Sequence, residues 1–373
     1  MYRAVFPLPP IVAAGLVAVA ALLATRLRLP PFTRRALGWG KTVAPLGWFL
    51  LGAILGPGLG LFDHSLLEAC APILAIAIGW VAARAGAEWG GATRETPASW
   101  SWAHVLDAAA ALLLPAALLG AAVLGQLTPT QQQWRVLGPT VLTMTAAAAL
   151  AGSGNAVRLT PVALAVAVAA LVAMLLPHTA VADAKRLLLA TGYTIGGAWI
   201  CTALAARLAR RGVLLPGTLA ALMLAAGIGY VTRLSPLVVC AVLGFALVRR
   251  SAPHARLAAE LRLHEPVAVA VLWTLAGAGA GGPLVAVALA TALFALWPIG
   301  RRLIGGPVDM DAALGLAIAA NFALTAGPAL GEWVRVVPTV AALGLLLVRI
   351  MPDIRTRYAE RLTSPAARVE VSA

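Results

Sequence analysis

The sequence predicts an all-α polytopic membrane protein of about thirteen transmembrane helices arranged as an inverted repeat. Three observations lead to this fold class. First, 61% of the 373 residues are hydrophobic and 11% are charged, whereas a soluble domain carries roughly 25% charged residues. Second, the hydrophobic residues form separate runs, each long enough to cross the ~30 Å hydrocarbon core of a bilayer. Third, the basic residues are concentrated in every second connection between these runs.

Windows of about 20 residues give thirteen candidate spans in chain order. They cover residues 11–27, 43–62, 66–84, 104–125, 135–152, 160–177, 187–206, 213–232, 235–249, 265–282, 283–300, 311–328 and 334–351. The first run continues into Arg26 and Arg28 without a small-residue cleavage site. We therefore expect a retained span there and not a removed signal peptide.

The positions of the basic residues support this number of spans. Successive spans cross in opposite directions, so alternate connections lie on one side of the membrane. All but six of the 28 Lys and Arg residues then fall on the same side. The exceptions are Arg3, Arg135, Lys185, Arg186, Arg233 and Arg335. Because Lys and Arg accumulate in cytoplasmic loops, the N-terminus is expected outside and the C-terminus inside. Chance placement of the charges is the alternative.

Thirteen spans permit an inverted repeat, with the seventh span as a linker between two sets of six. Many secondary transporters use this architecture to expose a site at the membrane midplane alternately to each side. No sequence similarity between the two halves is visible by eye. The last span is followed by a short cytoplasmic tail, residues 352–373.

Composition and spacing exclude several classes of function. The net charge of +14 is spread over short connections and not gathered on one basic domain, so no nucleic-acid partner is expected. No catalytic triad, metal-ligand cluster or paired carboxylates can be assembled at membrane depth, and we expect neither an enzyme nor a cofactor. Glycines at 277, 279 and 282 match a dinucleotide-binding spacing, but the strand that this motif requires is absent, and we expect close helix packing and a tight turn between the tenth and eleventh spans instead. Gly56, Pro57, Gly58 and Gly60 are expected to end the second span. The three cysteines are expected to pack inertly: Cys70, Cys201 and Cys240.

Two corresponding spans carry polar and helix-breaking residues. The fifth span and its end contain Thr143, Thr145 and Asn155, and the twelfth contains Asn321 and Thr325. Paired interruptions in corresponding helices indicate a substrate site in repeat transporters. Hydroxyl, amide and freed carbonyl oxygens there could coordinate a monovalent cation. Alternatively, the hydroxyls bond their own helix carbonyls, and Gly and Pro mark helix ends.

Asp107 is the one acid within a turn or two of a span interior, and His104 lies one turn before it on the same helix face. Such a pair could carry a proton. Alternatively, both lie at headgroup level beside Trp100 and Trp102. Glu265 directly precedes Pro266, and we expect it in the first turn of the tenth span, facing the helix dipole.

Two stretches resemble the monovalent cation:proton antiporter family of the Kef and sodium/proton exchanger type. LGAILGPGLGLF (Leu51 to Phe62), followed by LLEACAPILAIAIGWVAARAG, is similar to that family's second and third spans. LVVCAVLGFALVRR, then a basic loop and EPVAVAVLWTLAGAG, is similar to its ninth and tenth spans. The resemblance extends over residues 11–351, which would form one exchanger-like transmembrane domain.

The chain departs from the family pattern at three charged positions. Where the sixth span of the family carries Asp, this chain has Thr160 and Pro161, which makes Thr160 a neutral candidate for ion binding. The eleventh span has no basic residue before Arg301, and the Glu of the third-span motif is replaced by Val81. The resemblance thus implies a divergent member that lacks the usual membrane-embedded charges.

The resemblance also implies an arrangement and a location. Spans four to six and eleven to thirteen would form a core domain, in which the fifth and twelfth spans cross near the midplane. The other helices would form a scaffold and the surface of a homodimer. The chain would lie in a bacterial-type inner (plasma) membrane.

Two hypotheses for function follow. In the first, the chain is a secondary transporter that moves a monovalent cation or small solute by alternating access, with cation/proton antiport as the activity that the resemblance implies. In the second, it is a degenerate homologue that no longer transports and acts as a membrane scaffold or partner subunit. The missing charged positions favour the second hypothesis, and the paired polar spans favour the first.

The predicted topology can be tested with single cysteines placed near the two ends of a chain whose three native cysteines are replaced by Ala. We expect Ala4→Cys to react with an impermeant maleimide in intact cells, and Ser372→Cys to react only after permeabilisation. Labelling of both positions from the same side would mean an even number of spans and would exclude mirrored halves.

Overall fold

The computed structural model describes seven helical stretches of the chain. They are residues 43–60, 70–95, 214–231, 235–250, 254–280, 311–330 and 336–347, together with isolated positions between 192 and 207 and Thr291. Every element within these ranges is a helix, and none of the described residues forms a strand. The predicted all-α class is therefore confirmed for this part of the chain.

Seven helices correspond to seven of the predicted spans. They are α3 (Val43–Ala53), which continues as a π-helical turn η1 (Ile54–Gly58), α5 (Ala71–Glu95), α10 (Leu214–Val231), α11 (Pro236–Arg250), α12 (His254–Ala278), α14 (Ala312–Leu330) and a last helix, Val336–Leu347. Most of their ends lie within a few residues of the predicted boundaries. Two differ by about three turns: α5 continues past residue 84, and α12 begins well before residue 265.

Among the described helices, one segment is long and apolar enough to cross a membrane, Ala71–Glu88 of α5. A buried helix of a soluble protein would pass the same test. The other apolar segments are shorter: Ala44–Gly58, Gly217–Tyr230, Pro236–Arg249, Ala312–Leu324 and Val336–Leu347. The helical class is thus established for these ranges, and the number of spans stays a prediction.

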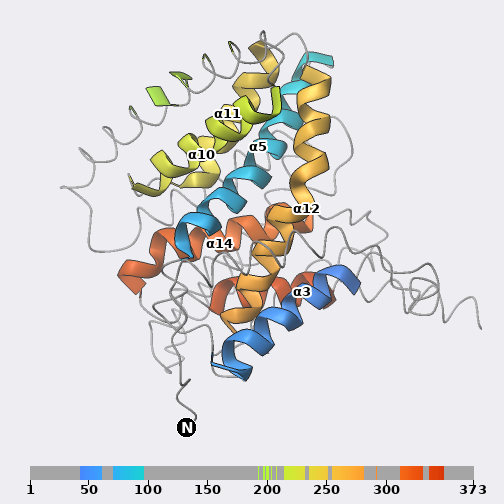
Figure 1. The fold of residues 1–373 in the computed structure, drawn as a ribbon, viewed down its shortest axis with the longest axis vertical. Helices are drawn as coiled ribbons and strands as arrows, with labels where there is room; N and C mark the ends of the chain where they lie inside the picture. The colour runs from blue at the N-terminus through green and yellow to red at the C-terminus, as the bar shows by residue number, and fades with distance from the viewer. Residues whose placement is uncertain are drawn as a thin grey trace, which may run out of the picture.

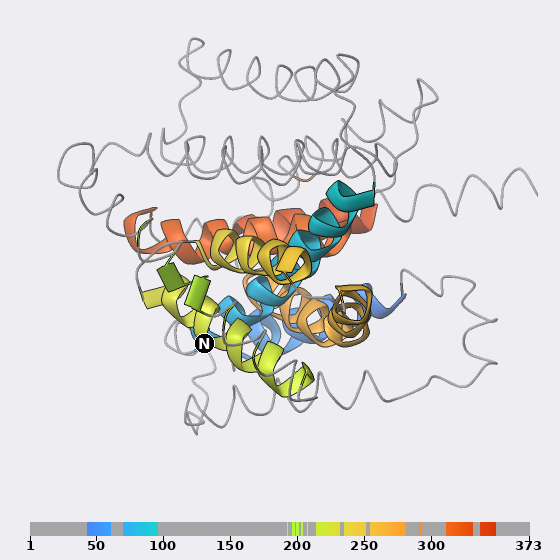
Figure 2. The ribbon, with the colours of Figure 1, turned by 90° about the horizontal axis from the view of Figure 1, so that it is seen from above.

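Helix α5 lies at the centre of the described bundle (Figure 1). It packs against α10, α11, α12 and α14, while α3 packs against α12. Seen from above, α14 lies along one side of this group (Figure 2). Segments far apart in the chain therefore share a single core.

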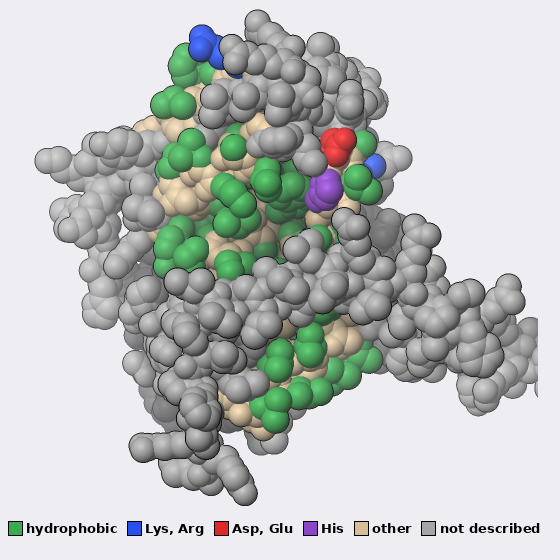
Figure 3. Space-filling view, viewed as in Figure 1, with side chains coloured by type: hydrophobic (Ala, Val, Ile, Leu, Met, Phe, Trp, Pro, Cys, Tyr) green, Lys and Arg blue, Asp and Glu red, His purple; other side chains and the backbone are tan. Residues whose placement is uncertain are grey.

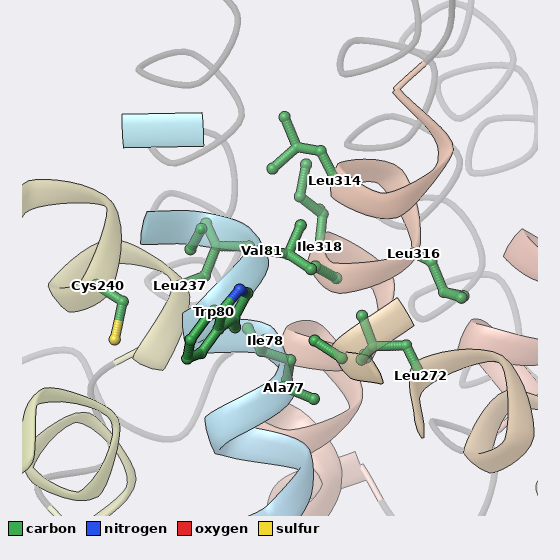
Figure 4. Close-up of a cluster of buried hydrophobic side chains, with 14 of the residues drawn as sticks. Ala77, Ile78, Trp80, Val81, Leu237, Cys240, Leu272, Leu314, Leu316 and Ile318 are labelled. Atoms are coloured by element: carbon green, nitrogen blue, oxygen red, sulfur yellow. The ribbon is translucent and has the colours of Figure 1, made fainter. Parts of the chain in front are cut away.

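The core of the bundle is apolar (Figure 4). Ile78 and Val81 of α5, Leu272 and Trp273 of α12 and Leu316 of α14 are all fully buried. Val81 is also part of this hydrophobic cluster. Burial of apolar surface of this kind contributes about 25 cal/mol per Å² when the alternative is water.

Two of the expected inert cysteines, Cys70 and Cys240, are buried, and neither forms a disulfide. Cys201 lies outside the described residues. The predicted packing role is confirmed for Cys70 and Cys240.

The glycines near Pro57 end the second predicted span, as expected. Because Pro57 has no N–H to donate, the turn widens, and the N–H of Leu59 donates to the carbonyl of Ile54 at 2.7 Å. Gly60 follows with φ 65°, a left-handed conformation that glycine adopts without strain.

Glycines bring the backbones of α5 and α11 into direct contact. A β-carbon on Gly86 would clash with the carbonyl oxygen of Ala241, and one on Gly244 would clash with that of Ala83. Each glycine therefore meets the carbonyl three residues before the other glycine. Such close approach permits Cα–H···O contacts and is typical of helix pairs joined through small residues.

Helices α3 and α12 form a second crossing with the same reciprocal pattern. A β-carbon on Gly52 would clash with the carbonyl oxygen of Thr274, and one on Gly277 would clash with that of Phe49. Here too each carbonyl belongs to the residue three positions before a glycine. Gly277 thus serves helix packing, as the rejection of the dinucleotide-binding motif predicted.

Contacts beyond the two crossings give the directions of the helices. Along α5 and α11 the contacts advance from Gly79 with Cys240 to Gly90 with Phe245, so the two helices run in the same direction. Along α3 and α12 the contacts advance from Gly52 with Thr274 to Gly56 with Ala278, so these two helices also run in the same direction. Each crossing therefore joins two helices of the same direction.

A glycine-to-alanine pair tests whether the crossings hold the bundle together. We expect Gly86→Ala to lower the free energy of unfolding by about 1–3 kcal/mol, because the added methyl group forces two backbones apart. Gly227→Ala on α10, whose β-carbon would meet open space, should be neutral or raise stability by up to about 1 kcal/mol through helix propensity. Thermal unfolding in one detergent measures both, and equal losses of stability would contradict the role assigned to the crossing.

Candidate functional site

Two of the eight predicted site residues lie within the described part of the chain, Asn321 and Thr325, both on α14. The other six lie outside the described residues: His104, Asp107, Thr143, Thr145, Asn155 and Thr160. The predicted crossing of the fifth and twelfth spans therefore stays a prediction. Thr325 lies one helical turn after Asn321, so the two residues share a face of α14.

Asn321 is buried near the middle of α14, with 3% of its surface exposed. Its side-chain oxygen Oδ1 accepts a hydrogen bond from the hydroxyl of Ser235 at 2.9 Å. Ser235 precedes α11, and its hydroxyl also lies 3.3 Å from the N–H of Val238, which donates to it. The amide thus ties α14 to the beginning of α11 inside an otherwise apolar environment.

A cluster of charged side chains surrounds Arg84, at the middle of α5. Only 7% of Arg84 is exposed. Its Nη1 lies 3.1 Å from Oε2 of Glu88, its Nε lies 2.8 Å from Oε1 of Glu265, and its Nη2 pairs with Oδ2 of Asp311. These carboxylates belong to α5, α12 and the residue before α14. One guanidinium therefore joins three helices, and we name these four residues the Arg84 cluster.

The outer edge of the Arg84 cluster is extended by Arg262. Its Nε donates to Oε1 of Glu88 at 3.0 Å, so Glu88 bridges a buried and an exposed guanidinium. Arg262 is 61% exposed, and a pair of this kind contributes about 1 kcal/mol or less. Acidic, basic and histidine side chains are seen together over α12 in Figure 3.

Trp80 fastens α5 to α12 beside the cluster. Its indole Nε1 donates to the carbonyl oxygen of Leu261 at 3.0 Å, and its ring meets His264 edge-on, with 6.1 Å between ring centroids. Leu261 lies five residues before Pro266, where the proline removes one backbone hydrogen bond from the interior of α12. The indole thus supports the helix close to the point where its own ladder is interrupted.

The structure corrects two expectations from the sequence. Glu265 is not in the first turn of a helix, because α12 begins at His254 and passes through Pro266. Arg84 does not lie in a connection between spans, because α5 continues to Glu95. In α5 and α12 the helix extends beyond the apolar run, because Arg84 and Glu265 pair with each other between the two helices.

Asp311 has two roles that use different oxygens. Its Oδ1 accepts a hydrogen bond from the N–H of Leu314 at 3.1 Å, which makes Asp311 the N-cap residue of α14. Its Oδ2 pairs with Arg84. The negative charge also faces the positive end of the α14 dipole. The end of α14 is thereby fixed both to its own first turn and to α5.

The chemistry of the Arg84 cluster is electrostatic. An arginine stays protonated in proteins, so it cannot act as a proton carrier. Buried charges persist only when they are paired, and three carboxylates supply more than one partner for the guanidinium. Among the described residues, no group of His, Cys, Asp and Glu has the arrangement of a metal site. The arrangement therefore holds helices together by ion pairs.

Two signals in the sequence could have revealed part of this cluster. Arg84 and Glu88 are four residues apart, the spacing of an ion pair on one helix face. Asp311 stands three residues before Leu314, the spacing of an N-cap. No local pattern connects these segments with Glu265, because that contact depends on how α5 and α12 pack.

Comparisons with known proteins give no relatives. No family model matches the chain, and no curated protein matches it. The resemblance to cation:proton antiporters therefore rests on the motifs quoted from the sequence.

Replacement of Arg84 separates the buried from the exposed part of the charge network. We expect Arg84→Ala to lower the free energy of unfolding by about 3–5 kcal/mol, because Glu265 and Asp311 lose their partner in a buried site. Arg262→Ala, which breaks one exposed pair, should cost about 1 kcal/mol or less. Thermal unfolding of both variants measures the difference, and similar shifts would mean that the network is hydrated and weak.

Proposed function

We propose that the chain is a polytopic membrane protein with an inverted repeat, and that it works as a secondary transporter of a monovalent cation or small solute. Cation/proton antiport is the activity that the resemblance favours. The observation that carries the proposal is the pair of reciprocal glycine crossings.

An inverted repeat pairs each helix of the first half with a helix of the second half, and the two crossings follow this pairing. If span two corresponds to span nine and span three to span ten, α3 corresponds to α11 and α5 to α12. The crossing of α5 with α11 then corresponds to the crossing of α12 with α3. The pattern of two glycines, each against the carbonyl three residues before the other, occurs in both. Two copies of one unusual contact in the two expected places support an internal repeat.

The directions of the helices support an inversion between the copies. In the view of Figure 1, α5 rises from its blue beginning to its teal end, whereas α12 descends from its yellow beginning to its orange end. These two helices are therefore antiparallel. Since α11 runs with α5 and α3 runs with α12, each helix is opposite in direction to its proposed counterpart. The same directions follow from the predicted topology, in which spans three and nine leave the outside and spans two and ten leave the inside.

The Arg84 cluster also agrees with the predicted sidedness. Arg84 is the last residue of the predicted third span, Glu265 is the first of the predicted tenth and Asp311 is the first of the predicted twelfth, so the cluster borders three predicted connections. The charge asymmetry assigns all three connections to the cytoplasmic side. Their meeting at one end of the bundle is expected if that assignment is correct.

Exposed apolar side chains favour a lipid environment. Leu219, Met223 and Leu224 of α10 are each more than a third exposed, as are Leu50 and Ile54 of α3. Hydrophobic side chains also cover much of the visible described surface (Figure 3). Large exposed apolar areas are rare on soluble monomers and mark contact with membranes or other proteins.

In this proposal, α14 contributes the neutral ligands. Asn321 presents an amide oxygen in an apolar interior, and the sequence places Thr325 one turn later on the same helix. Oxygen atoms of this kind coordinate monovalent cations in transporters that use interrupted helices. The present partner of the amide oxygen, Ser235, belongs to α11, so occupation by a cation would exchange a contact between two helices for contacts with the ion.

A second candidate function is that of a non-transporting scaffold or partner subunit. The Arg84 cluster favours it, because a permanently charged side chain holds three helices where a carrier must move. Replacement of the family's acidic position by the buried Val81 favours it too. Transport assays separate the two candidates.

Ion flux into proteoliposomes tests the proposed function. We expect an imposed proton or sodium gradient to drive a monovalent cation into liposomes that contain the purified protein faster than into protein-free liposomes. Asn321→Ala should reduce this flux by about tenfold or more. Gly227→Ala, on the surface of α10, is the matched control and should keep the flux. If no monovalent cation moves under either gradient, the transporter is excluded and the scaffold remains.

A further inference from the structure

α14 is attached to the rest of the described bundle differently from the other helices. The two glycine crossings join α5 to α11 and α3 to α12 through their backbones. α14 packs apolar side chains into the shared core, and polar contacts between side chains also join it to its neighbours: Asp311 with Arg84 at its beginning, and Asn321 with Ser235 ten residues later. At 1.5 Å per residue, these attachments are about 15 Å apart along the helix. Polar side-chain contacts can exchange with water or an ion, whereas backbones in direct contact cannot separate without losing their packing.

The Arg84 cluster allows one of these attachments to open at low cost. When Asp311 leaves, Arg84 still has Glu88 on its own helix and Glu265 on α12, both within 3.1 Å. The buried guanidinium is therefore never left without a partner, the situation that makes a broken buried ion pair so unfavourable. The side chain of Asp311 is 28% exposed, against 9% for Arg84. Asp311 can therefore be hydrated as it departs.

We propose that the ion pair between Arg84 and Asp311 is a latch that holds the beginning of α14 against α5 and opens when α14 moves. Arg84, Glu88 and Glu265 form the fixed part, and Asp311 is the part that leaves. The latch rests on the proposed function in one respect: its purpose is to control access to Asn321 and Thr325, which lie on the same helix. Its existence as a hinge point of α14 can be tested without any transport.

The substitution Asp311→Asn isolates the charge from the cap. Asn is as good an N-cap as Asp, so the bond to the N–H of Leu314 can persist while the charge toward Arg84 is lost. Hydrogen exchange of the full-length protein in lipid nanodiscs measures the result. We expect amides of α14 to exchange about tenfold faster or more in this variant, while those at the crossing of α5 and α11 keep their rates.

Two further variants serve as controls. Arg262→Gln removes the exposed ion pair to Glu88 and should leave exchange in α14 unchanged. Asp311→Ala removes cap and charge together and should accelerate α14 at least as much as Asp311→Asn. If only Asp311→Ala has an effect, the residue is a cap and the latch is overturned. Unchanged exchange in Asp311→Asn, or equal acceleration in α14, α5 and α11, would overturn it as well.

The failure of the latch and the failure of transport are distinguishable. Faster exchange in α14 of Asp311→Asn supports the latch even if the wild-type protein moves no ion, and the helix would then be released for a purpose other than carriage. Flux by the wild-type protein together with unchanged exchange in the variant would keep the transporter and overturn the latch.

Discussion

Direct contact between helix backbones at four glycines is the constraint on which the described bundle depends. At each of these positions a methyl group would occupy the place of a carbonyl oxygen of the neighbouring helix. Helices that approach so closely gain dispersion contacts along their length, which is how helices associate where lipid is as apolar as the side chains. The contacts also determine direction and rotation, because each glycine must face the partner.

The rotation of α5 decides where its charge points. Gly86 faces α11, and Arg84 lies two residues before it, about 200° away around a helix of 3.6 residues per turn. The guanidinium is therefore directed away from the glycine contact, toward the side where Glu265 and Asp311 lie. Because Gly86 fixes the face of α5 that packs on α11, Arg84 is placed among the carboxylates of two other helices.

The bundle combines contacts of different strength. Glycine crossings and the buried cluster around Ile78 and Trp273 have no polar partner to exchange. The contacts of α14 with Arg84 and Ser235 do, since water or an ion can replace either of them. α14 also packs Leu316 and Ile318 into the shared core, so the polar contacts are the part of its attachment that can exchange.

The sequence by itself determined the helical class and the positions of most described helices, because hydrophobic runs and their Pro, Gly and charged boundaries are local signals. It also identified the glycines at 56 and 277 as packing or turn residues and Asn321 as a polar residue within a hydrophobic run. It did not determine that α5 and α12 continue through charged residues, since an apolar run ends where partners from elsewhere begin. The Arg84 cluster and the two reciprocal crossings were decided by the tertiary structure alone. A buried charge is tolerated only beside its counter-charges, and these come from segments about 180 and 230 residues further along the chain, a separation that no local pattern can bridge.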